Sequence, residues 1–414
     1  MDGGKMKRRS FLGLTGLALL EAYAGFIIPP AHTRQIERSM RQSSETSHLI
    51  TLFLCGDVMT GRGIDQILPH PCNPILYESY VQDARDYVLL AERNSGLLPK
   101  PAAFSYIWGD ALAELDSRAP DLRIVNLETS ITTSNDYWPK GINYRMNPEN
   151  IGCLKAAAID CCTLANNHVL DWGYGGLIET LETLETNGIG YTGAGHNYGQ
   201  ATAPKVMVLP GKGRVLLFAF GSVSSGIPAR WAASRARPGI NLLTDLSTHT
   251  VSRIVETIQN YRRPGDIVVV SIHWGGNWGY RIPREQRRFA HELIDKAGVH
   301  LIHGHSSHHP KGVEIYHGRP ILYGCGDFIN DYEGISGNEQ YRSELGLMYF
   351  VSFEVDSNNL AAIELTPTRM HRFRVNRASR EEAGWLKQLL DREGGALGTR
   401  TVLHENNTLS LRWA

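Results

Sequence analysis

The stretch VHLIHGHSSHHPKG, which runs from Val299 to Gly312, joins an apolar segment to a cluster of four closely spaced histidines. Its first half has the short apolar pattern of a buried β-strand, and a glycine interrupts the histidines where a sharp loop would begin. Histidine binds metal ions and transfers protons near neutral pH. The stretch therefore predicts a buried strand that ends in a metal-binding or catalytic loop.

The same pattern recurs along the chain: apolar runs end at polar or glycine-rich residues, and helical patterns lie between them. This alternation predicts an α/β fold with a mostly buried sheet, in which ligand-binding groups gather at the carboxyl ends of the strands. The runs are LITLFLCGD (49–57), LRIVNLE (122–128), IDCCTLANNH (159–168), VLLFAFGS (215–222), DIVVVSIHWGG (266–276) and PILYGCGDF (320–328), and the helical patterns are AFSYIWGDALAELDS (103–117), GYGGLIETLETLETNG (173–188) and REQRRFAHELIDKAG (284–298).

Five of the predicted strand ends carry polar groups that can bind a metal ion. A single Asp, Asn or His at such a place is usually a turn former, a helix cap or a hydrogen-bonded residue, but their joint occurrence predicts a metal site. Carboxylate, amide and imidazole ligands together suit Mn, Fe or Zn better than Ca²⁺ or Mg²⁺. The candidates are Asp57, Asn126, Glu128, Asn167, His168, His273, His305 and His308.

The other two histidines of the cluster are expected to differ from these ligands. His303 still lies in the predicted strand, so it is expected to support the ligands from behind. His309 precedes Pro310 and is expected to be exposed.

Composition excludes several classes of protein. The 414 residues are 42% hydrophobic and 20% charged, which is enough apolar material for a large core. Lys plus Arg and Asp plus Glu number 42 each, so the chain lacks the basic excess of a nucleic-acid-binding protein. The six cysteines have no metal-binding spacing and are interpreted as buried thiols, with a disulfide that involves Cys72 as the alternative.

The first residues have the composition of an export signal. KMKRRSFLGLTGLALLEAYAGFIIPP (5–30) has a basic start, and Arg8–Arg9 before an apolar run resembles the twin-arginine signal of proteins exported after folding. An ordinary secretory signal or a retained membrane anchor is the alternative. We expect an export signal over 1–28, a linker over 29–47, the main domain over 48–375, and a helix begun by Ser379 with a hairpin over 376–414. The protein is expected in the periplasm or at the cell surface.

Six motifs resemble those of the capsule synthesis protein CapA family, which is associated with poly-γ-glutamate and has the calcineurin-like metallophosphoesterase fold. The resemblance runs in order from about Leu49 to Glu364. It implies a four-layer αββα sandwich with mixed sheets, one or two divalent metal ions and association with a capsule synthase complex in the membrane. The motifs are GDVMTGR (56–62), NLETSIT (126–132), NNHVLDWG (166–173), HWGGNW (273–278), GHSSHHPKGVE (304–314) and GRPILYGCGDF (318–328).

The resemblance also implies roles for single residues. Asp57 takes the first ligand position, Glu128 the bridging acid and Asn167 a further ligand, while His168 donates a proton to the leaving group. His273, His305 and His308 fill the later histidine positions. The sequence differs from the usual motifs of the metallophosphoesterase superfamily at two positions. Cys55 stands in place of the first residue of the opening D-x-H motif, and Glu128 replaces the usual bridging Asp.

Asp171 and Arg62 are further candidates, each with an ordinary alternative. Asp171 would orient the imidazole of His168, because a catalytic histidine needs its second nitrogen fixed, or it would cap the helix that follows. Arg62 would bind a substrate phosphate or carboxylate, or it would form a salt bridge to a neighbour.

Two functions follow. The first is a metal-dependent hydrolase that acts on a phosphoester or on an amide of an anionic polymer. The second is a factor that binds or anchors the capsule polymer without turnover. The stretch WGGNWGYRIPREQRR (274–288) would line a groove for an anionic chain, or it would cover a sheet edge and a solvated helix face.

Overall fold

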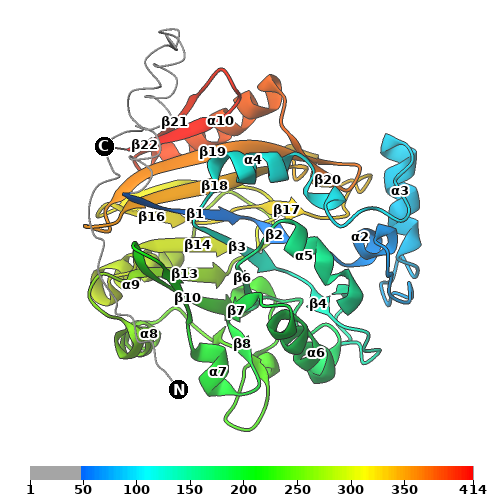
Figure 1. Ribbon diagram of the computed structural model, residues 1–414, viewed down its shortest axis with the longest axis horizontal. Helices are drawn as coiled ribbons and strands as arrows, with labels where there is room; N and C mark the ends of the chain where they lie inside the picture. The colour runs from blue at the N-terminus through cyan, green and yellow to red at the C-terminus, as the bar shows by residue number, and fades with distance from the viewer. Residues whose placement is uncertain (1–47, 414) are drawn as a thin grey trace, which may run out of the picture. The chain divides into compact units, whose positions relative to one another are not determined.

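The computed structural model describes residues 48–413, which form one compact unit from His48 onward. The predicted export signal and linker lie outside the described residues. Within this unit two large β-sheets pack face to face, and helices cover the outer face of each (Figure 1). No helix among the described residues is both long and apolar enough to cross a bilayer.

The larger sheet has eleven strands in the order β17-β2-β3-β1-β18-β19-β22-β21, with β6, β7 and β20 attached. Its β17, β2, β3, β6 and β7 run parallel, whereas β18 and β19 pair antiparallel to their neighbours, so the sheet is mixed. The bounds are β1 (Leu49–Cys55), β2 (Asp57–Val58), β3 (Leu122–Leu127), β6 (Cys161–Thr163), β7 (Gly190–Thr192), β17 (Asp327–Ile329), β18 (Leu345–Glu354), β19 (Leu360–His371), β20 (Arg374–Arg377), β21 (Thr399–Leu403) and β22 (Leu409–Trp413).

The second sheet has seven strands in the order β12-β10-β13-β14-β16-β15, with β9 on β10. Its central strands β10, β13, β14 and β16 are parallel, and every residue of β13 is buried. The bounds are β9 (Lys205–Leu209), β10 (Gly213–Ser222), β12 (Leu242–Leu243), β13 (Ile267–His273), β14 (Leu301–His305), β15 (Val313–Tyr316) and β16 (Arg319–Leu322); the pairs β4 (Ser130–Ile131) with β5 (Arg145–Met146) and β8 (Ala194–Gly195) with β11 (Gly239–Ile240) form two small ribbons.

Three apolar layers hold these elements together. Alternate residues of β1 serve different layers: Leu52 and Leu54 face the second sheet, whereas Phe53 faces the helices. Helices α4, α5 and α6 cover the larger sheet, and α8 and α9 cover the second sheet. This is the four-layer αββα sandwich that the resemblance implied. The helices are α2 (Arg62–Ile67), α3 (Arg85–Ser95), α4 (Asp110–Arg118), α5 (Gly152–Ala156), α6 (Gly173–Thr186), α7 (Tyr198–Thr202), α8 (Thr248–Tyr261), α9 (Arg284–Ala297) and α10 (Arg380–Gly395).

The elements differ from the sequence prediction at the start of one helix and at several elements that were not predicted. The helix predicted over 103–117 begins only at Asp110, because a 3-10 turn over Tyr106–Trp108 ends at Gly109, whose φ of 46° breaks the helix. The antiparallel hairpin of β18 and β19 and the amphipathic helix α8 were not predicted. Ser379, predicted to begin the C-terminal helix, is the N-cap of α10 and accepts a hydrogen bond from the backbone of Glu382 in a capping box.

The cysteines follow the buried-thiol interpretation. All six lie in the described residues, all are buried and none forms a disulfide. Burial raises the pKa of the Cys72 thiol, the residue for which a disulfide was the alternative, so its neutral form is favoured.

Candidate functional site

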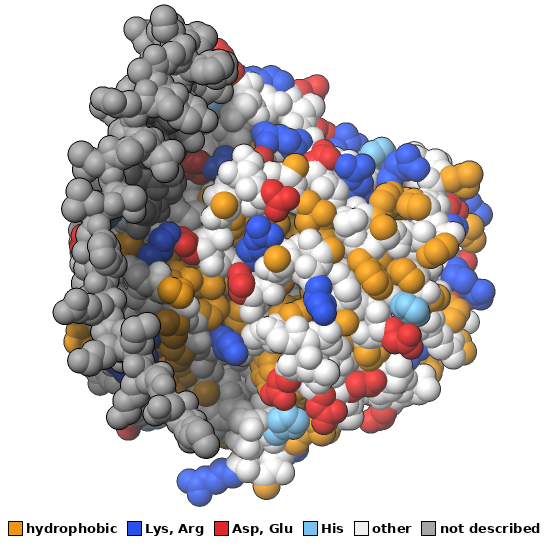
Figure 2. Space-filling view, viewed as in Figure 1, with side chains coloured by type: hydrophobic (Ala, Val, Ile, Leu, Met, Phe, Trp, Pro, Cys, Tyr) orange, Lys and Arg blue, Asp and Glu red, His pale blue; other side chains and the backbone are white. Residues whose placement is uncertain are grey.

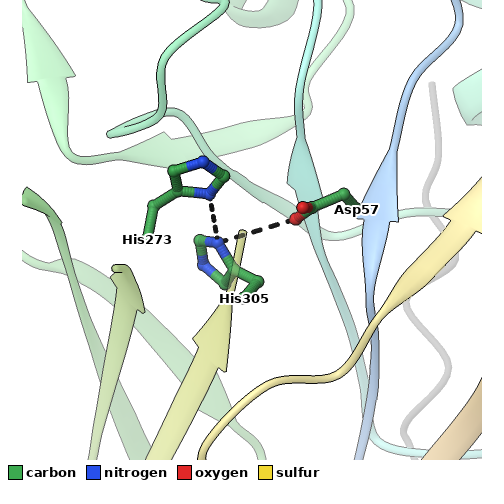
Figure 3. A group of neighbouring side chains, drawn as sticks. All are labelled: Asp57, His273 and His305. Carbon is green, nitrogen blue, oxygen red and sulfur yellow. Dashed lines mark hydrogen bonds and ion pairs between the residues drawn. The ribbon is translucent and has the colours of Figure 1, made fainter. Parts of the chain in front are cut away.

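The carboxyl ends of parallel strands from both sheets meet at one edge of the sandwich. His273 ends β13 and His305 ends β14, and the two residues are register partners. Asp57 begins β2 of the larger sheet and stands opposite Asn126 of β3. Figure 3 shows the three side chains Asp57, His273 and His305 pointing toward one another across the two sheets.

These three side chains form one group that could hold a metal ion. One ligand atom from each lies within 4.8 Å of the others, and all three residues are buried. The Nδ1 atoms of His273 and His305 are 2.8 Å apart, and Nδ1 of His305 lies 3.6 Å from Oδ1 of Asp57. Burial lowers the pKa of both histidines well below the usual value, so each is neutral and can offer a lone pair.

Three carboxylates form a second group with atoms within 4.8 Å of one another: Asp57, Glu128 and Asp327. Asp57 is common to both groups. Burial, followed by the charge of Asp327, raises the pKa of Asp57 to about 7, and burial together with Asp57 raises that of Glu128. Such a cluster of buried carboxylates is costly without a compensating positive charge, so its chemistry fits divalent cations.

Hydrogen bonds from behind fix the orientation of these ligands. Asn126 Nδ2 donates to Oδ1 of Asp57 at 2.7 Å, and the backbone N–H of Ser306 donates to Oδ2 at 3.2 Å. Ser306 holds this N–H in place with a φ of 97°, a conformation that non-glycine residues rarely adopt. His303, predicted to support the ligands, is fully buried, and its Nε2 hydrogen-bonds to the carbonyl of Cys55 at 2.8 Å.

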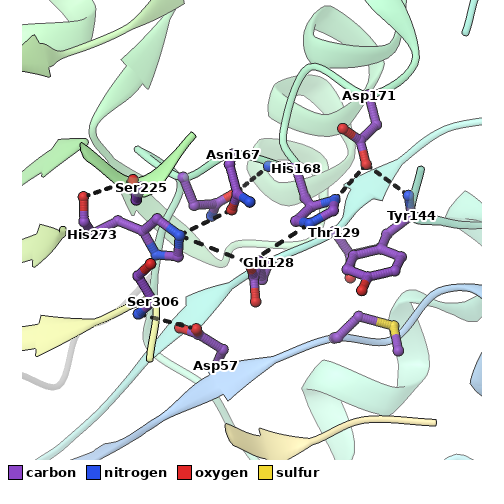
Figure 4. A network of polar contacts seen from close by, with 12 residues as sticks. Asp57, Glu128, Thr129, Tyr144, Asn167, His168, Asp171, Ser225, His273 and Ser306 are labelled. Carbon is purple, nitrogen blue, oxygen red and sulfur yellow. Dashed lines mark hydrogen bonds and ion pairs between the residues drawn. The ribbon is translucent and has the colours of Figure 1, made fainter. Parts of the chain in front are cut away.

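A histidine–aspartate pair lies beside the two groups. His168 Nδ1 donates to Oδ2 of Asp171 at 2.6 Å, which leaves Nε2 facing Glu128, whose Oε1 lies 3.8 Å away. Lys140 forms an ion pair with Oδ1 of Asp171 at 2.8 Å, and the ring of Tyr144 stacks on His168 with centroids 3.9 Å apart. Figure 4 shows this pair together with Glu128, Asn167 and Asp57. Asp171 thus orients His168, while Trp172 is the residue at the N-cap of α6.

Burial, Lys140 and Arg62 together lower the pKa of His168 well below its usual value. Burial also raises the pKa of Asp171 to about 7, an effect that Lys140 opposes. In the protein without bound ions the imidazole is therefore neutral at pH 7, with its proton on Nδ1 and a lone pair on Nε2. His168 must gain a proton at Nε2 before it can donate one.

A recess of about 530 Å³ lies next to the His168–Asp171 pair and the two groups of candidate ligands. Glu128, Asn167, His168 and His308 line its inner end. The outer part is bounded by segments that include Trp278 and residues 335–344. A volume of this size accommodates a small organic substrate.

Two of the predicted ligands stand at the margin of the groups. Oδ1 of Asn167 lies 2.9 Å from Nε2 of His273, and Nδ1 of His308 lies 2.9 Å from Oδ1 of Asp327. Although burial alone would lower the pKa of His308, the charge of Asp327 raises it. Both side chains are half-buried and line the recess, so they can contact a ligand as well as an ion.

Arg62 is largely engaged by the protein. Its guanidinium donates to Asp331 at 3.1 and 2.5 Å and to Glu78 at 3.0 Å, and it stacks 3.8 Å above the ring of Tyr87. The salt-bridge interpretation therefore holds, while part of the side chain also lines the recess. A role in substrate binding stays a prediction.

The prediction that His309 is exposed was wrong. The residue is fully buried, and its Nε2 accepts a hydrogen bond from the backbone N–H of Gly279 at 3.1 Å. Its ring stacks with Tyr341, because the loop after β14 turns back under the segment that carries Trp278. The prediction for His309 used only the proline that follows it, and local sequence contains no information on packing against Trp278 and Tyr341.

The basic part of the groove expected over 274–288 does not form. Trp274 is buried, and Arg287 pairs with Glu314 at 2.5 Å. Of this stretch, only Asn277 and Trp278 line the recess. The remaining residues of 274–288 fit the alternative, in which the stretch covers a sheet edge and a helix face.

Sequence reasoning missed Asp327, Lys140 and Tyr144. Asp327 follows Gly326 at the end of the predicted strand PILYGCGDF, so it carried the same signal as Asp57 and could have been found. Lys140 and Tyr144 lie in an irregular segment before β5, and no local pattern distinguishes them.

Comparison with known proteins identifies relatives of the chain. Residues 51–332 match the family model described as bacterial capsule synthesis protein PGA_cap. A probable polyglutamine synthesis accessory protein of Mycobacterium tuberculosis strain H37Rv is 44% identical over 365 residues, which cover 88% of this chain and 96% of that protein. The PGA biosynthesis protein CapA of Bacillus subtilis is 28% identical over 257 residues, 61% of this chain and 63% of that protein.

Among solved structures, a novel phosphatase from Mycoplasma pneumoniae matches 80% of this chain and 95% of its own, with 15% identity and a TM-score of 0.43. The family match covers the segment that supplies every candidate ligand, from Asp57 through Asp327. The resemblance found in the motifs is thereby confirmed: the chain belongs to the bacterial capsule synthesis protein family PGA_cap.

Proposed function

We propose that the protein is a metal-dependent hydrolase of the phosphoesterase type that serves capsule or poly-γ-glutamate synthesis. The observation that carries this proposal is the His168–Asp171 hydrogen bond of 2.6 Å beside two groups of buried metal-binding side chains, at the end of an open recess. A protein that only anchors a polymer has no need of an oriented imidazole next to such ligands.

The two groups are suited to hold one or two divalent ions, with Mn, Fe or Zn favoured by the mixed ligand set. Asp57, His273 and His305 would hold the first, and Asp57 would share the second with Glu128 and Asp327. The chemistry supplied by ions in such a site is activation of water and polarisation of the bond that breaks. Asn167, whose Oδ1 lies 2.9 Å from Nε2 of His273 at the inner end of the recess, would complete the ligand set.

His168 exchanges the proton in this proposal. Asp171 holds Nδ1–H, so Nε2 faces the site; it would take up a proton from solvent in the recess and then pass it to the leaving group. Because the pKa of His168 is lowered, the imidazolium is a strong acid once formed, which favours fast transfer to a basic leaving oxygen. Lys140 favours the ionised form of Asp171 against the effect of burial, and Tyr144 packs on the ring and restricts its rotation.

We also propose that the protein acts outside the cytoplasm, in the periplasm or at the cell surface. The support is the twin-arginine-like segment at Arg8 and Arg9, which lies outside the described residues. The relatives are a polyglutamine synthesis accessory protein and a PGA biosynthesis protein, which supports association with a membrane complex that makes the polymer.

The test is metal content and hydrolysis of p-nitrophenyl phosphate by the purified protein. His168→Ala should lower kcat by about 10² to 10⁴ while its metal content stays near that of the wild type, because the other ligands remain. Asp57→Ala should lose both metal and activity. His317→Ala, an exposed histidine paired with Asp295, is the matched control and should change neither.

A different result would favour the second function, a factor that binds or anchors the capsule polymer. If the protein is such a factor, His168→Ala should leave hydrolysis and capsule formation unchanged, and Asp57→Ala should unfold the protein. Loss of metal in His168→Ala would instead make this residue a ligand.

A further inference from the structure

The outer part of the recess contains an aromatic surface that the proposed chemistry does not use. Trp278 is 36% exposed and lines the recess. Its ring is supported by Tyr341, 5.3 Å away, and by His309, 6.2 Å away, which stack on each other. A supported indole offers a flat apolar surface to a ligand at little entropic cost.

Uncharged polar side chains surround this surface. Four of them line the recess and form no side-chain hydrogen bond with any residue that the structure describes: Asn277, Ser336, Asn338 and Ser343. Amide and hydroxyl groups both donate and accept, so this set suits a ligand with many hydroxyl groups. Glu339 adds acceptor oxygens at the same rim.

The charges of the recess disfavour a polyanion. Its two basic side chains are already neutralised within the protein: Lys140 pairs with Asp171, and Arg62 pairs with Asp331 and Glu78. Among the described residues that line the outer part, the carboxylate of Glu339 forms no ion pair. On the face drawn in Figure 2, basic and acidic side chains are interspersed. A chain of carboxylates would therefore meet repulsion in the outer recess.

We propose that the outer recess binds an uncharged sugar ring. A sugar has an apolar C–H face, which stacks on the indole of Trp278, and an edge of hydroxyl groups, which Asn277 and Asn338 bind. This inference rests on the proposed function and deepens it: the substrate is a sugar or glycan that carries one hydrolysable anionic ester, and the ester lies at the ligand end of the recess.

Binding to the full chain, measured by titration calorimetry in the presence of a chelator, tests the sugar site without catalysis. The probes are chitotetraose, cellotetraose, maltotetraose and tetra-γ-glutamate. We expect at least one neutral oligosaccharide to bind at least about tenfold more tightly than tetra-γ-glutamate, a difference of about 1.4 kcal/mol. Trp278→Ala should weaken that binding by about tenfold or more. Tyr261→Ala, an aromatic of similar exposure on α8, should leave it unchanged.

Asn338→Ala provides a second variant if Trp278→Ala folds poorly. The Asn338 side chain forms no hydrogen bond with the described residues, so its removal should leave stability unchanged and weaken oligosaccharide binding several-fold. Absence of binding by all three oligosaccharides, or tighter binding of tetra-γ-glutamate, overturns the inference. Equal binding by Trp278→Ala and the wild type does so as well. Failure of the hydrolase proposal alone would appear in the phosphatase assay and would leave these affinities as they are.

Discussion

Asp57 shows how much the site depends on a single side chain. It is 1% exposed, belongs to both groups of candidate ligands, and accepts hydrogen bonds from Asn126 and from the backbone of Ser306. Burial, followed by the charge of Asp327, raises its pKa. In the absence of metal the buried carboxylate therefore contributes little to stability, and under the proposed function it would serve as a ligand in the presence of metal.

This conflict predicts that, in the presence of a chelator, the wild type and Asp57→Asn differ in their free energy of unfolding by an amount that depends on pH. The folded pKa of Asp57 is about 7 and the unfolded value about 4, so only the folded state holds the proton between these limits. The stability contributed by that proton is present below pH 4 and is lost as the pH rises to 7. Relative to Asp57→Asn, the wild type should lose up to about 4 kcal/mol of unfolding free energy over this range.

Urea unfolding at pH 4.5, 5.5, 6.5 and 7.5 measures this difference. The control is Asp245→Asn. Hydrogen bonds from Ser247 and Thr250 lower the pKa of Asp245 to about 2, so the carboxyl stays ionised over this range. The difference in unfolding free energy between the wild type and Asp245→Asn should therefore not change with pH. Excess Mn²⁺ at pH 7.5 should reverse the order of wild type and Asp57→Asn through binding to the folded state. A pH-independent difference for Asp57→Asn would contradict the raised pKa.

Among the elements, α10 closes one end of the core between the sheets. Its Leu386, Leu389 and Leu390 are buried in the layer that also contains β1 and β19. The helix begins with the capping box of Ser379 and Glu382, and Arg369 pairs with Glu382 at 2.8 Å. The start of the helix is thereby tied to β19.

Loss of this cap should destabilise the whole fold. Ser379→Ala removes the acceptor for the backbone N–H of Glu382, and such changes cost about 1 kcal/mol. Thermal or urea unfolding should show this loss in a single transition, because α10 packs into the shared core. Ser252→Ala, inside the exposed face of α8, is the control and should stay within about 0.5 kcal/mol of the wild type. Equal stability of both variants would mean that the helix end frays without cost.

At the scale of the whole molecule, the candidate metal ligands come from both sheets, so they come together only after the sandwich has formed. His273 and His305 belong to one sheet, and Asp57 and Asp327 belong to the other. A protein with such a site benefits from export after folding, because the ions can be acquired inside the cell. The twin-arginine route, proposed from Arg8 and Arg9, has this property.

Arg8→Lys combined with Arg9→Lys should therefore retain the protein in the cytoplasm. Cell fractionation followed by immunodetection measures this, and Arg34→Lys with Arg38→Lys, in the segment expected to be a linker, is the control and should be exported normally. Unchanged export of the first variant would favour the ordinary secretory route.

Sequence alone determined the strands that end in the candidate ligands and most of those candidates. Asp57, Glu128, His273 and His305 were predicted because each follows a buried strand, and parallel strands bring their carboxyl ends to one edge. Helix α10 was predicted because its cap and its periodicity are both local. The family resemblance added the four-layer arrangement of two mixed sheets between helices.

Only the tertiary structure decided how these residues combine. It made Asp57 the candidate ligand common to both groups, buried His309 beneath Trp278, and engaged Arg62 with Asp331, which is 269 positions away in the chain. It also brought Lys140 to Asp171 from an irregular segment. These outcomes depend on contacts between residues distant in the sequence, and a local pattern encodes the periodicity and end of an element but not which other element will pack against it.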